Sequence, residues 1–380
     1  MKLVDDLVSL GGRVTREGID LAQGALTGTV LRGARAGLDL ARQLPTLLPK
    51  DLDALYRSAL DEVRAELEEI PEQALRVDVA GLMARWGKVL AGRGTEADRR
   101  AQDRLREAFR AKARYGAEYF VAPGSVAVAP TKRHLVHRSG TLSLFRYERT
   151  GGPVKPAAKA PPVLLVYSLI NRSYILDLME GASFVAHLLD QGLDVFIVEW
   201  GEAKKNDRET TLDRWLLEDL PSCVSAIRTI TRKRRVSLLG HCMGGVFAAA
   251  YAGLHPKDVD RLLAITTPFT AAEGGLVALW TDRRLFPVDA LVDGLGLMPG
   301  KLIRLTFLTL KPWYEVMRWR IFLDNAGNDA VMRPFLAADA WVNDNPDLHG
   351  EVYRKFAKSV YFEDGLRKGT LGVGDRTVGL

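Results

Sequence analysis

From residue 163 onward, short apolar runs alternate with longer segments whose apolar residues recur at helical spacing. The runs carry few charges and lie at 163–167, 195–200, 236–239 and 262–265. Runs of this length are typical of buried parallel strands. The segments between them predict helices over 181–191, 211–231 and 243–254. This alternation predicts an α/β fold with a doubly wound, mostly parallel sheet.

The residues before this region follow two other patterns. Apolar and polar positions alternate at 134–137 and 141–147, on either side of Ser139 and Gly140, which predicts a β-hairpin. Residues 1–118 instead repeat apolar positions every three or four residues, with glutamates filling the other face at 52–67. We therefore expect a helical N-terminal region without a catalytic motif, which serves either as a structural extension or as a partner- or granule-binding module.

A G-x-C-x-G pentapeptide at 240–244 follows the third apolar run and opens the next predicted helix. This is the context of the nucleophile elbow of α/β-hydrolases, a strained turn that lifts its central residue into a pocket. Gly240 and Gly244 must be small so that strand and helix can approach each other. The pattern predicts Cys242 as nucleophile and the Met243 amide as an oxyanion donor. The alternative is a small buried cysteine in an ordinary strand–turn–helix unit.

After Pro268 the strand–helix alternation stops. Residues 271–368 contain several tryptophans and helical stretches but no obvious strand, so we expect a helical lid inserted into an α/β-hydrolase core. We divide the chain into a helical N-terminal region at 1–118, a core with the elbow at 119–270, the lid at 271–368 and the start of a further core segment at 369–380.

Composition and charge limit the class of protein. The 380 residues are 47% apolar and 26% charged, as in a soluble globular protein, and the net charge of +6 indicates a solvated arginine-rich surface or an anionic partner. The two cysteines, Cys223 and Cys242, suggest no disulfide framework, which indicates a reducing cytoplasm. Asp5 and Asp6 exclude a signal peptide, and no apolar stretch could span a bilayer. Zinc-finger spacing, an RNA-binding aromatic motif and a P-loop are missing from the sequence, so we do not expect nucleic acid as a partner. We also expect no metal and no cofactor.

Four segments in collinear order resemble the polyhydroxyalkanoate synthases. They are LLVYSLINRSYILDL at 164–178, the strand at 191–201, the cysteine-bearing box GHCMGG at 240–245, and the lid signature at 340–347 with 350–353. The resemblance covers about residues 126–380. The wording YSLINR is most similar to the short catalytic subunits, which work with a second, non-catalytic subunit.

The resemblance implies an acyltransferase of the α/β-hydrolase fold. Cys242 would accept an (R)-3-hydroxyacyl group from CoA, and the amides of Met243 and Ile170 would bind the oxyanion. Trp341 would line the acyl path, although it could also be an ordinary aromatic core residue. The implied partners are the acyl-CoA substrate, a polyester granule, and either a homo-oligomer or a second synthase subunit. The implied location is the cytoplasm, with association with the granule as a further expectation.

The family's triad acid and histidine follow the lid, and the resemblance places both beyond Leu380. Only His255 and His349 follow Cys242, and thirteen helical residues put His255 about 18 Å away. We expect His349 to be a solvated helix residue rather than a base. We assign neither acid nor base, and we expect residues 1–380 alone to be weakly active or inactive, with an exposed sheet edge.

Three nearby side chains have structural interpretations. His241 shares the elbow backbone with Cys242, so we expect it to lie between elbow and core. Asp344 and Asp347 are expected to cap lid helices.

Two other functions remain open. A cysteine-elbow esterase or thioesterase would release free acid and make no polymer. A non-catalytic paralogue would bind granules or a true synthase, and Cys242→Ala would leave its behaviour unchanged. A thiol nucleophile favours transfer over hydrolysis, because exchange of one thioester for another keeps the acyl group activated.

Overall fold

The computed structural model describes residues 126–149, 160–204, 207–270, 286–310 and 328–380, together with Ile321 and Asn325. The expectations for residues 1–118 and for the start of the predicted lid at 271–285 lie outside the described residues. Contacts divide the chain into two compact units: Met1–Val121 with Lys311–Met332, and Ala122–Leu310 with Arg333–Leu380. The second unit contains the sheet and the elbow.

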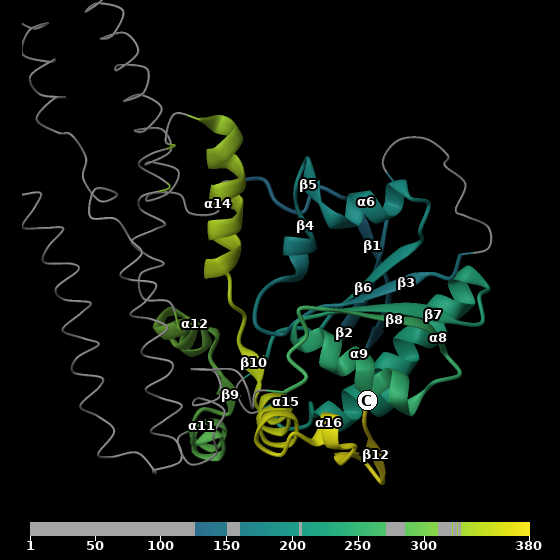
Figure 1. The fold of residues 1–380 in the computed structure, drawn as a ribbon, viewed down its shortest axis with the longest axis vertical. Coiled ribbons are helices and arrows are strands. Elements are labelled where there is room, and N and C mark those ends of the chain that lie inside the picture. Colours follow the sequence, from purple (N-terminus) through teal and green to yellow (C-terminus); the bar gives the residue numbers. More distant parts are fainter. Residues whose placement is uncertain are drawn as a thin grey trace, which may run out of the picture. The chain divides into compact units, whose positions relative to one another are not determined.

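A six-stranded sheet forms the core of this unit (Figure 1). In spatial order its strands are β1 (Arg133–Ser139), β2 (Leu142–Tyr147), β6 (Val195–Glu199), β3 (Val163–Val166), β7 (Val236–His241) and β8 (Val259–Ile265). β1 and β2 form the expected antiparallel hairpin, β2 is antiparallel to β6, and the remaining pairs are parallel. The mostly parallel sheet confirms the fold class predicted from the sequence.

Helices cover both faces of the sheet. They are α6 (Phe184–Asp190), α7 (Leu212–Arg214), the π-helical turn η4 (Trp215–Asp219), α8 (Leu220–Thr231) and α9 (Met243–Leu254). On β3, Leu164 and Val166 belong to the core cluster that includes α8 and α9, whereas Val163 and Leu165 join the cluster that includes α6. Figure 1 shows α6 on one side of the sheet and α8 and α9 on the other. This double cover explains why β3 is apolar throughout.

Short elements complete the unit. After β3 come the 3-10 turn η3 (Ser173–Leu176) and the strands β4 (Asp177–Met179) and β5 (Ala182–Ser183). In and after the predicted lid region the structure has α11 (Val288–Leu295), β9 (Leu297–Met298), α12 (Gly300–Leu310), α14 (Asp329–Asn343), β10 (Leu348–His349), α15 (Gly350–Lys355), the π-helical turn η5 (Phe356–Phe362), α16 (Gly365–Lys368), β11 (Leu371–Val373) and β12 (Arg376–Val378). No helix within these described ranges combines the length and apolarity of a bilayer span.

The expectation of no strand between residues 271 and 368 was wrong. β9 and β10 pair antiparallel, with Leu348 opposite Met298 and His349 opposite Leu297. Two residues cannot display a period-2 pattern, and the partners are about fifty residues apart in the chain, so local periodicity could not reveal the pairing.

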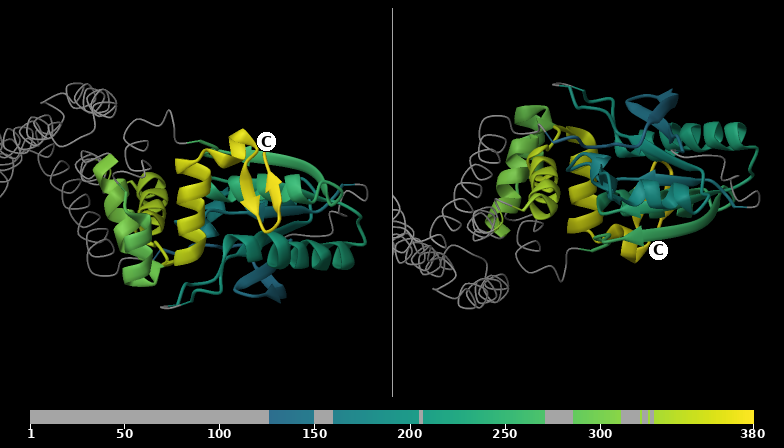
Figure 2. Two further views of the ribbon diagram at one scale, coloured as in Figure 1. Left: turned by 90° about the horizontal axis from the view of Figure 1, so that it is seen from below. Right: turned by 90° about the horizontal axis from the view of Figure 1, so that it is seen from above.

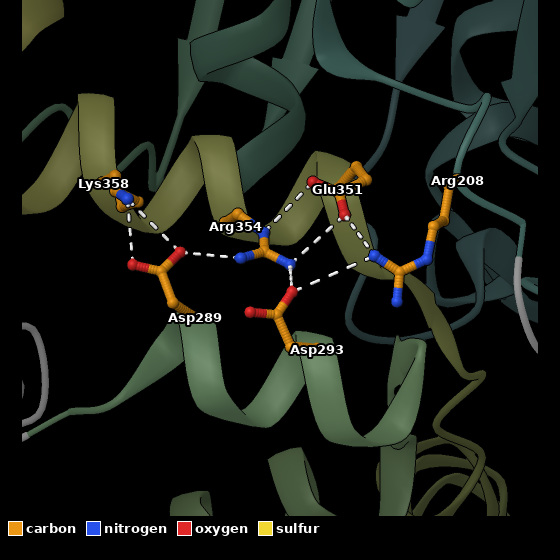
Figure 3. Close-up of polar contacts among 6 residues, drawn as sticks. All are labelled: Arg208, Asp289, Asp293, Glu351, Arg354 and Lys358. Atoms are coloured by element: carbon orange, nitrogen blue, oxygen red, sulfur yellow. Dashed lines mark hydrogen bonds and ion pairs between the residues drawn. The ribbon is translucent and has the colours of Figure 1, made fainter.

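Charged side chains join α11 to α15 and η5 (Figure 3). Arg354 lies at the centre, with nitrogens 2.8 Å from Asp289, 2.6 Å from Asp293 and 3.1 Å from Glu351. Lys358 adds a 2.9 Å contact to Asp289. Single exposed pairs stabilise little, but Arg354 is mostly buried and shared among three carboxylates. The network fixes how these two segments of the predicted lid region pack together.

β8 forms one edge of the described sheet, and three of its apolar side chains are partly exposed. Leu262, Leu263 and Ile265 have exposed fractions of 40%, 47% and 37%. The expected exposed edge is therefore present in the described sheet. The hairpin of β11 and β12 lies elsewhere, where β12 contacts α9 and β11 contacts α16 (Figure 2).

Candidate active site

Cys242 sits in the turn that joins β7 to α9. Its backbone has φ 52° and ψ −131°, a conformation that is unfavourable for any residue with a Cβ. Two backbone hydrogen bonds hold the turn: the Cys242 amide donates to the Ile265 carbonyl at 3.0 Å, and the Gly245 amide donates to the Cys242 carbonyl at 2.9 Å. The strained strand–turn–helix geometry is that of a nucleophile elbow.

Three glycines permit the close approach of strand and helix around Cys242. A Cβ on Gly240 would lie 2.3 Å from the Gly245 Cα, and one on Gly244 would lie 2.1 Å from the Val166 carbonyl oxygen. A Cβ on Gly245 would lie 1.9 Å from the Thr267 hydroxyl oxygen. The sequence pattern pointed to Gly240 and Gly244. The need for Gly245 was missed, although the Gly-Gly pair was a visible signal.

The Met243 amide is placed at the first turn of α9. Amides there have no acceptor within the helix, and the partial positive charge of the helix end favours an anion. The predicted second amide, from Ile170, donates to the Ser168 hydroxyl over 3.3 Å. That bond is long, so a developing oxyanion would compete with Ser168 for the same N–H. Both oxyanion assignments remain predictions.

Two tyrosines lie near the Cys242 thiol, and sequence reasoning found neither. Burial first, and then the negative charge of a Cys242 thiolate, raise the pKa of both the Tyr167 and the Tyr361 hydroxyl. Both hydroxyls therefore stay protonated at neutral pH. Tyr167 directly follows β3, whereas Tyr361 lies in η5, more than a hundred residues after Cys242.

His241 and His255 have other contacts. The His241 ring stacks on Tyr167 with centroids 5.0 Å apart, and its Nε2 lies 3.3 Å from the Thr266 hydroxyl. Burial lowers the pKa of His241, which keeps the ring neutral. His255 follows the last turn of α9 and stacks on Tyr251 at 4.7 Å. Neither set of contacts would orient the imidazole as a general base for Cys242, and we assign that role to neither histidine.

The expectation that His349 is a solvated helix residue was wrong. His349 lies in β10 with 2% of its surface exposed. Its Nδ1 is 3.3 Å from an Asp207 carboxylate oxygen, and its ring meets Trp215 edge-on at 5.5 Å. The burial follows from the β9–β10 pairing, which places the side chain against the core.

The burial of His349 predicts acid sensitivity. Burial lowers the pKa of this imidazole, and Asp207 opposes the shift only in part. The unfolded chain, with an imidazole pKa of about 6.5, therefore takes up the proton first. The contribution of neutral His349 to the free energy of unfolding is fully present above about pH 6.5. Below that pH it decreases, by at most about 1.4 kcal/mol per pH unit for one group. Urea unfolding at pH 7 and pH 5 should show a smaller loss for His349→Gln than for wild type, and equal losses would contradict this prediction.

Residues 341–345 lie against the loop that carries Ile170. The Trp341 indole N–H donates to the Arg172 carbonyl at 2.7 Å, and the Asn345 amide donates to the Ile170 carbonyl at 3.2 Å. Whether Trp341 also lines an acyl path stays a prediction. Asp344 was expected to cap a helix, but it accepts from the Arg172 side chain at 3.3 Å. Asp347 does accept from the Gly300 amide at the start of α12, at 2.9 Å, as a cap would.

A pocket of about 320 Å³ lies at the carboxyl ends of β3 and β6. Its lining includes Ser168, Arg172, Glu199, Trp200 and His349. Crevices at this end of a parallel sheet are the usual place for ligands in α/β folds. Cys242 does not line this pocket, so we do not assign it to the acyl group.

Comparison with known proteins identifies the family. The family model for the α/β hydrolase fold matches residues 161–368. A poly(3-hydroxyalkanoate) polymerase subunit PhaC from Synechocystis sp. is 35% identical over 261 residues, which cover 67% of this chain and 68% of that protein. The chain belongs to the PhaC polymerase family. The PhaC subunit of Allochromatium vinosum is 32% identical over 70% of this chain and 74% of its own length.

The family assignment confirms the resemblance seen in the sequence and the predicted fold. Among solved structures, a probable hydrolytic enzyme from Pseudomonas aeruginosa PAO1 is 19% identical, with a TM-score of 0.32 over 58% of this chain and 70% of that one. A similarity that low supports no further conclusion about this PhaC family member.

Proposed function

We propose that this PhaC family member transfers (R)-3-hydroxyacyl groups from CoA to the Cys242 thiol and from there to a growing polyester. The observation that supports this most is the positive-φ backbone of Cys242 between β7 and α9, in a chain of the polymerase family. A non-glycine residue keeps that conformation only when its surroundings impose it, and such strain is concentrated at functional sites.

In the first step the Cys242 thiolate attacks the thioester carbonyl of the acyl-CoA. The carbon–sulfur bond to CoA breaks and a new thioester forms on Cys242. CoA leaves as a thiolate and takes up the proton that the Cys242 thiol had lost. Negative charge develops on the carbonyl oxygen, which would accept a hydrogen bond from the Met243 amide. The Ile170 amide would donate to the same oxygen after its bond to the Ser168 hydroxyl breaks. Exchange of one thioester for another costs little free energy.

In the second step the hydroxyl of another 3-hydroxyacyl unit attacks the acyl group on Cys242. An oxygen ester forms, the hydroxyl proton is lost, and the Cys242 sulfur leaves as thiol. The ester is more stable than the thioester, so this step drives chain growth. An ester on a serine would have lost that driving force in the first step.

The setting of the reaction is also a proposal. We infer action at a cytoplasmic polyester granule, as a homo-oligomer or together with a second synthase subunit. The support is the similarity of residues 164–172 to the short catalytic subunits of the family.

The test is an incubation of the purified chain with (R)-3-hydroxybutyryl-CoA, in which CoA, polymer and free acid are quantified by chromatography. CoA release with polymer supports the proposal. CoA release with an equal amount of free 3-hydroxybutyrate identifies a thioesterase. A folded chain that releases no more CoA than Cys242→Ala is non-catalytic by itself, and the proposal is then wrong for residues 1–380.

A further inference from the structure

The contact between residues 341–345 and the loop at 170–172 consists of directed hydrogen bonds to backbone carbonyls. Trp341 donates through its indole N–H at 2.7 Å, and Asn345 donates through its side-chain amide at 3.2 Å. The partner of Asn345 is a carbonyl oxygen, so its NH₂ group must face the loop. Trp341 is 169 residues from Arg172 in the chain, and Asn345 is 175 residues from Ile170, so these contacts exist only in the folded unit.

The carbonyls of Ile170 and Arg172 lie between β3 and η3, outside any strand ladder. Loop carbonyls that are shielded from water need a hydrogen-bond donor from the protein. Trp341 and Asn345 supply those partners from one short segment. A third contact comes from Asp344, which accepts from the Arg172 guanidinium at 3.3 Å, while the same guanidinium also reaches Glu202.

The Ile170 carbonyl belongs to the peptide plane that joins residues 170 and 171, and the Arg172 carbonyl belongs to the plane that joins residues 172 and 173. Fixing both carbonyls therefore holds the backbone that directly follows the Ile170 Cα. Among the described residues, the Ile170 amide is held only by the long bond to Ser168. The amide lies in the peptide plane before Ile170, next to the plane that Asn345 holds, so its direction depends on the backbone that Asn345 fixes directly and that Trp341 fixes two residues further on. Trp341 also packs against the apolar cluster that contains Tyr167.

We propose that Trp341 and Asn345 are positioning residues for acyl transfer, which hold the Ile170 loop in the orientation that binds the oxyanion. The inference rests on the proposed function, since it assigns these residues to the acylation of Cys242. Loss of a single oxyanion donor costs about 100- to 1,000-fold in rate, and a misplaced donor costs less. We therefore expect a loss of about 10- to 100-fold in the maximal acylation rate, with little change in the acyl-CoA concentration for half-saturation.

Two variants test the assignment. Trp341→Phe keeps an aromatic ring beside Tyr167 and removes only the N–H donor. Asn345→Ala removes the amide donor. The matched control is Asn343→Ala, because Asn343 is exposed and its amide bonds to Asp339 inside α14, at 2.8 Å. Thermal unfolding establishes that each variant is folded.

Two rates are measured on each protein: single-turnover CoA release from (R)-3-hydroxybutyryl-CoA and alkylation of Cys242 by iodoacetamide. Alkylation displaces iodide at carbon and develops no oxyanion, so it reports thiol access and reactivity alone. We expect slow acylation with unchanged alkylation in Trp341→Phe and Asn345→Ala, and wild-type values for both rates in Asn343→Ala.

Wild-type acylation in both test variants would overturn the inference and leave the proposed function standing. A parallel fall in acylation and alkylation would also overturn it, because the residues would then act on the thiol or on the fold. If wild type releases CoA no faster than Cys242→Ala, the proposed function fails and the inference fails with it.

Discussion

Cys242→Ala should reduce CoA release from (R)-3-hydroxybutyryl-CoA to the uncatalysed background and abolish polymer. The elbow presents the Cys242 thiol at the start of α9, whereas Cys223, the other cysteine, is buried in α8. Loss of the nucleophile removes covalent catalysis, so we expect all CoA release above background to disappear, even from a wild-type chain that is only weakly active by itself. The measurement is CoA release by chromatography at saturating substrate.

Two matched variants separate chemistry from folding. Cys223→Ala removes the other cysteine, which is fully buried in α8 and whose pKa burial raises to about 12, so it should retain the wild-type rate. Cys242→Ser keeps the size of the side chain but would lock the acyl group in an oxygen ester, which should stop polymer growth. CoA release and polymer that persist in Cys242→Ala would contradict the role of Cys242.

Gly244→Ala should unfold the unit or nearly do so. The added Cβ would lie 2.1 Å from the Val166 carbonyl oxygen and 2.5 Å from that of Tyr167. Both oxygens belong to backbone at the end of β3, a strand that pairs with β6 on one side and β7 on the other, so it cannot move aside. Steric conflict with fixed backbone belongs to the costly class of mutations, and we expect a loss of about 3–5 kcal/mol in the free energy of unfolding.

The matched control is Gly294→Ala in α11. A Cβ there meets no atom within 4 Å, and alanine favours a helix over glycine by about 1 kcal/mol. Urea unfolding should therefore show Gly294→Ala as stable as wild type or slightly more stable. If Gly244→Ala unfolds at the wild-type urea concentration, the close approach of α9 to β3 is wrong.

The elbow and the sheet could be predicted because their signals are local. The apolar runs of β3, β6 and β7 stand between helical segments, and the pentapeptide around Cys242 marks the turn within five residues. The start and end of α9 agree with the predicted helix at 243–254. Each of these features follows from backbone sterics and strand–helix periodicity within one short stretch.

The surroundings of Cys242 could not be predicted, because they are assembled from distant segments. Tyr361 comes near Cys242 from η5, and the Asn345 side chain bonds to the Ile170 carbonyl although the two are 175 residues apart in the chain. His349 was misplaced for the same reason, since its burial depends on the pairing of two very short strands. Helical periodicity says which face of a segment is apolar, but not which other segment that face meets.

The central claim is that Cys242 carries the acyl chain, and peptide mass spectrometry tests it most directly. The chain is incubated briefly with (R)-3-hydroxybutyryl-CoA, quenched in acid and digested without reducing agent. We predict that the peptide with Cys242 gains the mass of one or more 3-hydroxybutyryl units, that hydroxylamine removes the adduct, and that the Cys223 peptide stays unmodified. CoA release and polymer formation without any adduct on Cys242, or with an adduct on another residue, would contradict the claim.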